Sequence, residues 1–159
     1  MMARIQSLIF YAAAMALLLL AYHVATSFAF AIVDEGYRYM EPALQARETL
    51  LLDTRRSTIT ELKTDDLIAY RTIYRSKPMR MFGRVAALPG MTISVRKERL
   101  IVEGADVAPA GKDLDVLRTG LMVPRETVFV VFDSPLGQRV SLPQRLVPYR
   151  NIIGRMAGK

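Results

Sequence analysis

Side chains that commonly carry chemistry are sparse in this sequence of 159 residues. It has no Cys and one His, His23, so a transition-metal site would need several carboxylates. The adjacent acidic pairs Asp34-Glu35 and Asp65-Asp66 would point in different directions along an extended chain, which favours solvated positions. There is no Gly-rich loop of the kind that binds phosphate groups. We therefore expect no metal, no cofactor and no nucleic-acid partner, and no small-molecule substrate is identified.

Two short segments are more informative than these isolated residues. The first is Tyr39-Met40-Glu41-Pro42-Ala43-Leu44, and the second is Gly83-Arg84-Val85-Ala86-Ala87-Leu88-Pro89-Gly90. They resemble the two signature boxes of the type I signal peptidase family, S-M-x-P-T-L and K-R-V-x-x-L-P-G-D. In that family the Ser is the nucleophile and the Lys is the general base. Tyr39 and Gly83 stand in those places, so the resemblance implies that both catalytic side chains are missing.

Further segments extend the resemblance along the chain in the family's order. They are Asp66–Tyr70, Val102–Gly104, Val123–Val131, Ser141–Arg145 and Ile152–Arg155. Asp65 and Met91 depart from the Gly and Asp that the family has at these places. The resemblance implies a mainly β fold, in which one N-terminal transmembrane helix precedes an antiparallel-β, signal-peptidase-like ectodomain.

The resemblance also implies a cleft that binds a peptide or a partner protein. A Ser hydroxyl is a poor nucleophile until a base takes its proton, and the family's Lys does this as a buried neutral amine. A guanidinium stays protonated, so Arg84 cannot replace that amine. Replacement serines and lysines exist, among them Ser141 and Lys77, and a relocated dyad remains an alternative. The residues expected to line the cleft are Tyr37, Tyr39, Met40, Pro42, Gly83, Arg84 and Ser141.

A long apolar stretch precedes these segments. Residues 5–33 contain no Asp, Glu, Lys or Arg, and this exceeds the roughly 20 residues that a membrane-spanning helix needs. The sequence therefore predicts a transmembrane helix in residues 1–33 and a separate β domain in residues 34–159. Arg4 precedes the stretch and acidic residues follow it, which favours a cytoplasmic N-terminus. We expect a single-pass protein of the bacterial inner membrane with a periplasmic domain. Cleavage as a signal peptide after Ala29-Phe30-Ala31 is less favoured, because the stretch is too long.

His23 and its neighbour Tyr22 lie inside this apolar stretch. A polar ring within a membrane span is costly and usually faces protein rather than lipid. We therefore expect Tyr22 and His23 to contact a partner helix, with a metal-ligand role for His23 as the weaker interpretation.

The remaining sequence predicts mostly strands. Alternating or continuous apolar runs predict strands at 49–53, 67–74, 79–88 and 127–132, and a hairpin over 92–102. Residues 105–120, which include Pro109 and Gly111, have no clear period and predict an exposed insert. Residues 139–142 are expected to pair with the strand at 127–132, and 151–156 to form a last strand or turn.

Three functions fit these observations. We favour a catalytically inactive membrane protein that acts as a structural, scaffolding or assembly subunit of a larger inner-membrane complex. The first alternative is a divergent active endopeptidase with a relocated Ser/Lys pair. The second is a basic module that docks on lipid or protein, since the net charge is +7 and Arg provides 17 of the 22 basic residues.

Overall fold

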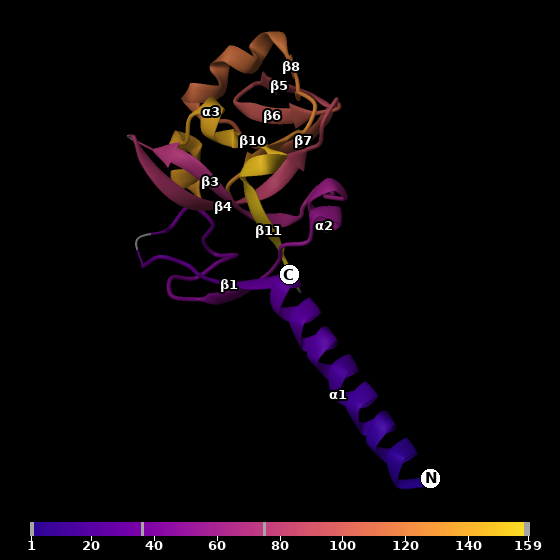
Figure 1. The fold of residues 1–159 in the computed structure, drawn as a ribbon. Helices are drawn as coiled ribbons and strands as arrows, with labels where there is room; N and C mark the ends of the chain where they lie inside the picture. The colour runs from indigo at the N-terminus through magenta and orange to yellow at the C-terminus, as the bar shows by residue number, and fades with distance from the viewer. Residues whose placement is uncertain (1, 36, 75, 158–159) are drawn as a thin grey trace.

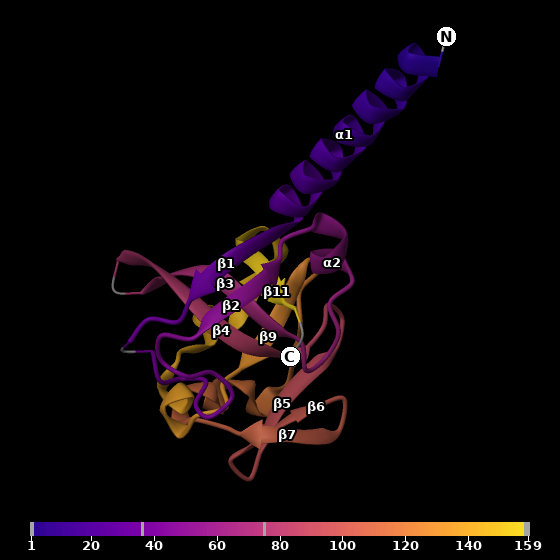
Figure 2. The same ribbon diagram turned by 90° about the horizontal axis from the view of Figure 1, so that it is seen from below.

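A long helix and a β domain make up the protein (Figure 1). The computed structural model describes residues 2–35, 37–74 and 76–157. Helix α1 (Met2–Ser27) leaves one end of the β domain in both views (Figures 1 and 2). This arrangement confirms the expected fold class, an N-terminal apolar helix followed by a mainly antiparallel-β domain.

The described residues of the domain form two antiparallel sheets. The larger has the order β1-β2-β11-β3-β4-β9-β10 and the smaller the order β7-β6-β5-β8. The strands are β1 (Phe28–Ile32), β2 (Thr49–Asp53), β3 (Leu67–Tyr74), β4 (Lys77–Ala87), β5 (Thr92–Arg96), β6 (Arg99–Val102), β7 (Ala105–Pro109), β8 (Leu121–Met122), β9 (Thr127–Val131), β10 (Leu146–Pro148) and β11 (Ile152–Met156). Short helices lie between them: α2 (Arg56–Thr60), η1 (Lys112–Thr119), η2 (Pro135–Arg139), α3 (Leu142–Arg145) and η3 (Tyr149–Asn151).

Helix α1 is long and apolar enough to cross a bilayer over Ile9–Ser27. Within this part only the last residue, Ser27, is buried against the domain. The helix ends six residues before the predicted limit at residue 33. The last apolar residues instead form β1, which pairs with β2 from Phe28 opposite Asp53 to Ile32 opposite Thr49. Pairing satisfies their backbone groups within a sheet, so these residues belong to the β domain.

Most of the predicted strands are confirmed. Strand β3 has the predicted bounds, and β4 begins two residues earlier than expected. The hairpin of β5 and β6 turns at Lys97 and Glu98, which both have positive φ. Strand β9 is buried at every residue, as its continuous apolar sequence indicated.

Two predictions are wrong. The expected exposed insert at 105–120 contains β7 and η1, and Leu114 and Leu117 of η1 are buried in the core of the smaller sheet. Residues 139–142 form no strand; they join η2 to α3, and β9 pairs with β10 instead. Pro143 lies in the first turn of α3, where a helix needs no N–H from it, and it favours a short helix after Ser141.

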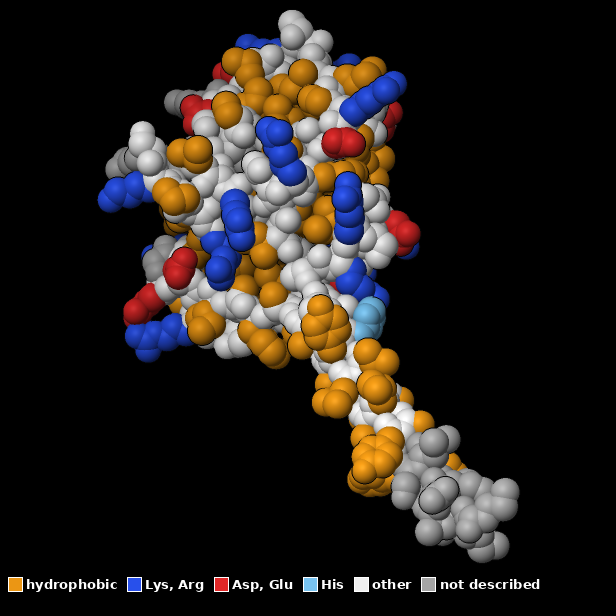
Figure 3. Space-filling view, in the orientation of Figure 1, with side chains coloured by type: hydrophobic (Ala, Val, Ile, Leu, Met, Phe, Trp, Pro, Cys, Tyr) orange, Lys and Arg blue, Asp and Glu red, His pale blue; other side chains and the backbone are white. Residues whose placement is uncertain are grey.

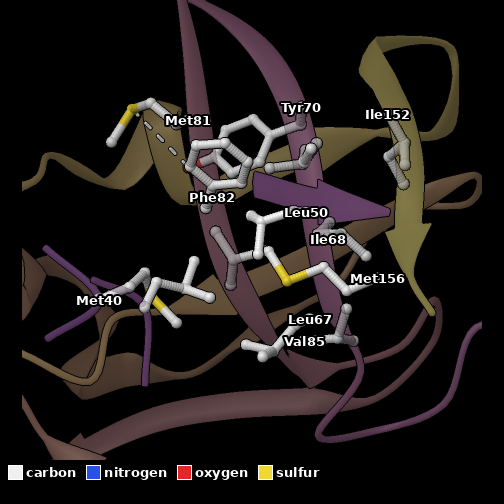
Figure 4. Packing of buried hydrophobic residues seen from close by; sticks show 14 of the residues in the cluster. Met40, Leu50, Leu67, Ile68, Tyr70, Met81, Phe82, Val85, Ile152 and Met156 are labelled. Carbon is white, nitrogen blue, oxygen red and sulfur yellow. Dashed lines mark hydrogen bonds between the residues drawn. The ribbon is translucent and has the colours of Figure 1, made fainter. Parts of the chain in front are cut away.

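The larger sheet carries the main hydrophobic core. Side chains from four of its strands converge there, among them Leu50, Ile68, Val85 and Met156 (Figure 4). A second cluster, which includes Ile93 on β5, packs between the smaller sheet and η1. The two clusters meet across β9, since Val130 belongs to the first and Phe129 to the second.

A buried carboxylate fixes the junction between the helix and the domain. Asp53, at the end of β2, is 4% exposed and accepts hydrogen bonds from the Arg55 guanidinium and from the Thr58 hydroxyl at 3.0 Å. The next residue, Thr54, donates its N–H to the Ser27 carbonyl at the end of α1. The Arg55 guanidinium, through these hydrogen bonds, holds the pKa of the Asp53 carboxyl well below its usual range.

Acid should therefore weaken the domain through Asp53. Its folded-state pKa is depressed, so its stabilising contribution is complete above the unfolded pKa of about 4 and is lost as the pH falls below it. We expect Asp53→Asn to lower the denaturation midpoint at pH 7 and to flatten the decline of stability between about pH 5 and pH 2. Urea titration of the full chain in neutral detergent measures both effects. Asp106→Asn, which removes an exposed ion pair with Arg99, is the control and should change little. Equal acid sensitivity of wild type and Asp53→Asn would contradict this role.

Candidate functional site

The loop between β1 and β2 is tied to β4 by one phenol. Tyr37 is 2% exposed, and its hydroxyl donates to the Phe82 carbonyl at 2.5 Å and accepts the Phe82 N–H at 2.9 Å. Burial raises the pKa of the Tyr37 hydroxyl, so it keeps the proton that it donates. The loop that carries the first signature segment is therefore held against β4 one residue before Gly83.

Tyr39, where the sequence resemblance would place the family's nucleophile, is half-buried in an aromatic cluster. Its ring centroid lies 5.3 Å from that of Tyr37 and 6.0 Å from that of Phe132. Its carbonyl accepts the N–H of Ser134 at 3.0 Å, which ties the loop to the segment after β9. The Tyr39 ring therefore packs against other aromatic rings.

Gly83, where the sequence resemblance would place the family's general base, is buried on β4. A Cβ atom added there would lie 3.1 Å from the Val130 Cβ and 3.5 Å from the Tyr70 ring. Tyr70 is 1% exposed, and its hydroxyl donates to the Gln144 carbonyl at 3.1 Å. Figure 4 shows the Tyr70 ring beside Phe82 of β4. Val130 and Tyr70 thus fill the space in which a side chain at position 83 would start.

A buried arginine of α3 packs against the aromatic cluster. Arg145 is 3% exposed, and its guanidinium donates to the carbonyls of Val140 at 3.0 Å and Gly137 at 2.6 Å. The guanidinium carbon lies 5.1 Å from the centroid of the Phe132 ring, a cation–π distance. Burial lowers the pKa of Arg145 to about 10, which still leaves it charged at neutral pH. Sequence reasoning did not name Arg145 as a site residue, although it is the last residue of the Ser141–Arg145 segment that resembles the family.

Arg84 and Ser141 occupy the borders of this region. Arg84 is half-buried and forms a two-bond ion pair with Asp133, at 2.6 and 3.0 Å, while a third bond reaches the Asp65 carbonyl. This pairing joins β4 to the segment after β9. Ser141 is half-buried and precedes the first residue of α3.

Met40 and Pro42 lie on opposite sides of their loop. Met40 is fully buried in the main core, so it fills space between hydrophobic residues and does not line an open surface. Pro42 is exposed and borders a hollow of about 440 Å³ formed by its own loop. Of the predicted cleft residues, the structure thus gathers Tyr37, Tyr39, Gly83 and Arg84 around one part of β4.

The replacement nucleophiles and bases are scattered. Lys63, Lys77 and Lys97 are exposed, whereas a lysine base needs an apolar enclosure; the side chain of Lys112 and all of Lys159 lie outside the described residues. The Ser134 hydroxyl is buried and accepts the Leu136 N–H.

Tyr22 and His23, the residues expected to contact a partner helix, are exposed on α1, within two turns of its end at Ser27.

Comparison with known proteins identifies the family. The family model described as "Signal peptidase, peptidase S26" matches residues 6–157, so the chain belongs to this family of serine peptidases. Among solved structures, the chain is similar to the crystal structure of a signal peptidase I from Enterococcus faecalis V583. The identity is 17%, the TM-score is 0.44, and the match covers 61% of this chain and 97% of the other. A search of curated proteins found no match. Family membership and helix α1 together indicate a membrane-anchored protein.

The packing around Gly83 predicts that a larger residue at this position destabilises the protein. Gly83→Ala should lower the free energy of unfolding by about 1–2 kcal/mol, because the new methyl group crowds Val130. The same substitution should cost less in a Val130→Gly background, where the Cβ and Cγ2 atoms that it would crowd have been removed. Urea denaturation of the four full-length proteins, followed by circular dichroism, gives this double-mutant cycle. An equal cost in both backgrounds would show that the space beside Gly83 is not filled by Val130.

Proposed function

We propose that this protein is a catalytically inactive, membrane-tethered member of the signal peptidase family that serves as a structural, scaffolding or assembly subunit of a membrane protein complex. The observation that carries the proposal is the packing at two positions. Tyr39 and Gly83 replace the nucleophile and the base, and aromatic and aliphatic side chains occupy the space around both.

The chemistry of acyl transfer explains why this packing matters. A hydroxyl nucleophile needs a neutral base within hydrogen-bond reach and open space for the substrate carbonyl. The Tyr39 ring packs against Tyr37 and Phe132, and Gly83 has no side chain to accept a proton. Arg84 follows Gly83 in the chain and Arg145 lies over the Phe132 ring, and guanidinium groups do not act as bases at neutral pH.

A peptidase fold without its catalytic pair can still bind protein. Strands β1 and β10 are the edges of the larger sheet, and β7 and β8 are the edges of the smaller sheet. An edge strand has backbone groups without a strand partner on one side, and an extended segment of another protein can pair with them. This supports a role in holding a partner chain, with the exposed Tyr22 and His23 on α1 as a second contact to a membrane protein.

The proposed setting is the bacterial inner membrane. Arg4 precedes the apolar part of α1 and Asp34-Glu35 follow β1, so the positive-inside rule favours a cytoplasmic N-terminus. The β domain would then lie in the periplasm, where it could meet the extracytoplasmic parts of other inner-membrane proteins.

An assay for cleavage tests inactivity directly. The full-length protein, reconstituted in liposomes, is incubated with a secretory precursor beside an active signal peptidase as positive control. We expect no cleavage above the protein-free background, and no change with Ser141→Ala or Lys77→Ala. Cleavage that either substitution abolishes would overturn the proposal in favour of the divergent active enzyme.

Mild detergent extraction tests the scaffolding role. We expect the full chain to co-purify with other membrane proteins, and Tyr22→Ala/His23→Ala to reduce their recovery about 5- to 30-fold, as the loss of roughly 1–2 kcal/mol of helix contact implies. Tyr11→Ala, which removes an exposed ring nearer the start of α1, is the control and should not matter. A chain that migrates alone would contradict the role. If Tyr11→Ala had the same effect as the double substitution, the helix contact would be refuted.

A further inference from the structure

A hollow of about 430 Å³ lies between α2 and η3. Its apolar side is formed by Ile59 and Ile152. Its polar lining consists of Arg56, Thr60, Glu126, Tyr149 and Arg150. The hollow is separate from the aromatic cluster around Tyr39, and none of its residues belongs to the two signature boxes at 39–44 and 83–90.

The hollow lies at the membrane end of the domain. Strand β2 ends at Asp53, opposite the first residue of β1, and Thr54 bonds the Ser27 carbonyl at the end of α1. Arg56 follows two residues later at the start of α2. Figures 1 and 2 both show α2 close to the point where α1 leaves the domain. If α1 spans the bilayer up to Ser27, the lipid headgroup layer begins at this level.

The two arginines of the hollow differ from their neighbour Arg55. The Arg55 guanidinium is bound by the Asp53 carboxylate, and it also lies 5.7 Å from the Phe28 ring centroid. Arg56 and Arg150 are exposed, and neither takes part in an ion pair among the described residues. Figure 3 shows basic side chains on the domain close to the exit of the helix.

The chemistry of the lining suits an anion that carries oxygen acceptors. Two guanidinium groups against the one carboxylate of Glu126 give the lining a formal charge of +1. Guanidinium groups bind phosphate oxygens with two parallel hydrogen bonds. Burial and the nearby Glu126 raise the pKa of Tyr149, so its hydroxyl retains its proton and can donate as well.

We propose that this hollow binds the phosphate group of an acidic phospholipid, with Arg56 and Arg150 as its two charged ligands. The acyl chains of the lipid would remain in the bilayer alongside α1. Such a site would fix the height and the rotation of the β domain on the membrane, whether or not the protein cleaves peptides.

The test uses the full-length protein in neutral detergent micelles with short-chain phosphatidylglycerol as the probe. Binding is followed by the rise in unfolding temperature and by native mass spectrometry. We expect saturable binding of phosphatidylglycerol, and a loss of affinity of about tenfold or more in Arg56→Gln/Arg150→Gln, as two interfacial arginines at roughly 1 kcal/mol each imply. The control is Arg96→Gln/Arg139→Gln, which removes the same charge at two exposed positions outside the hollow and should bind as the wild type does.

Several results would overturn the site. These are equal affinity of the wild type and the Arg56/Arg150 variant, equal loss in the control variant, or equal binding of phosphatidylcholine. Inorganic phosphate that saturates the hollow as well as the lipid does would overturn the assignment to a membrane lipid. The unfolding temperatures of all variants without lipid should match, since every substituted side chain is exposed.

Discussion

The arrangement of the candidate site depends on the Tyr37 hydroxyl, which is both donor and acceptor to the backbone of Phe82. A buried phenol that bonds both backbone groups of one residue fixes the position of the loop between β1 and β2 over β4. Tyr39 follows two residues later, so its ring has little freedom other than to pack between Tyr37 and Phe132. Burial keeps this hydroxyl protonated, so the link does not change with pH in the physiological range.

Gly83, Tyr70 and Arg145 complete the packing of the candidate site around this link. Gly83 leaves a gap on β4, and the ring of Tyr70 reaches it while its hydroxyl is held by the Gln144 carbonyl. Arg145 follows Gln144, caps the Phe132 ring and satisfies two carbonyls of the η2 segment. The two positions at which the sequence resemblance would place the family's nucleophile and base are thus part of a continuous packed layer, and this packing supports the proposed loss of peptidase chemistry.

The sequence predicted the parts of this fold that local pattern controls. Leu67–Tyr74 became β3 with its predicted bounds, because alternation and aromatic content specify a strand within eight residues. The packing around Gly83 could not be predicted, since Tyr70 meets a carbonyl 74 residues away and Val130 approaches from another strand. Arg145 ends a segment that resembles the family, but its burial could not be predicted, because burial of one arginine among 17 depends on tertiary contacts alone. The helix limit was misplaced because an apolar strand that follows a membrane span has the same composition as the span.

The most direct measurement of the central claim is the intact mass of the full-length protein after incubation with an excess of a fluorophosphonate, which phosphonylates activated serine nucleophiles. With Tyr39 and Gly83 packed as described, no serine in the described part of the chain is hydrogen-bonded to a lysine, and we expect the mass to remain unchanged. A single stoichiometric adduct on Ser141 or another serine, lost when one lysine is replaced, would contradict the claim and show a working nucleophile.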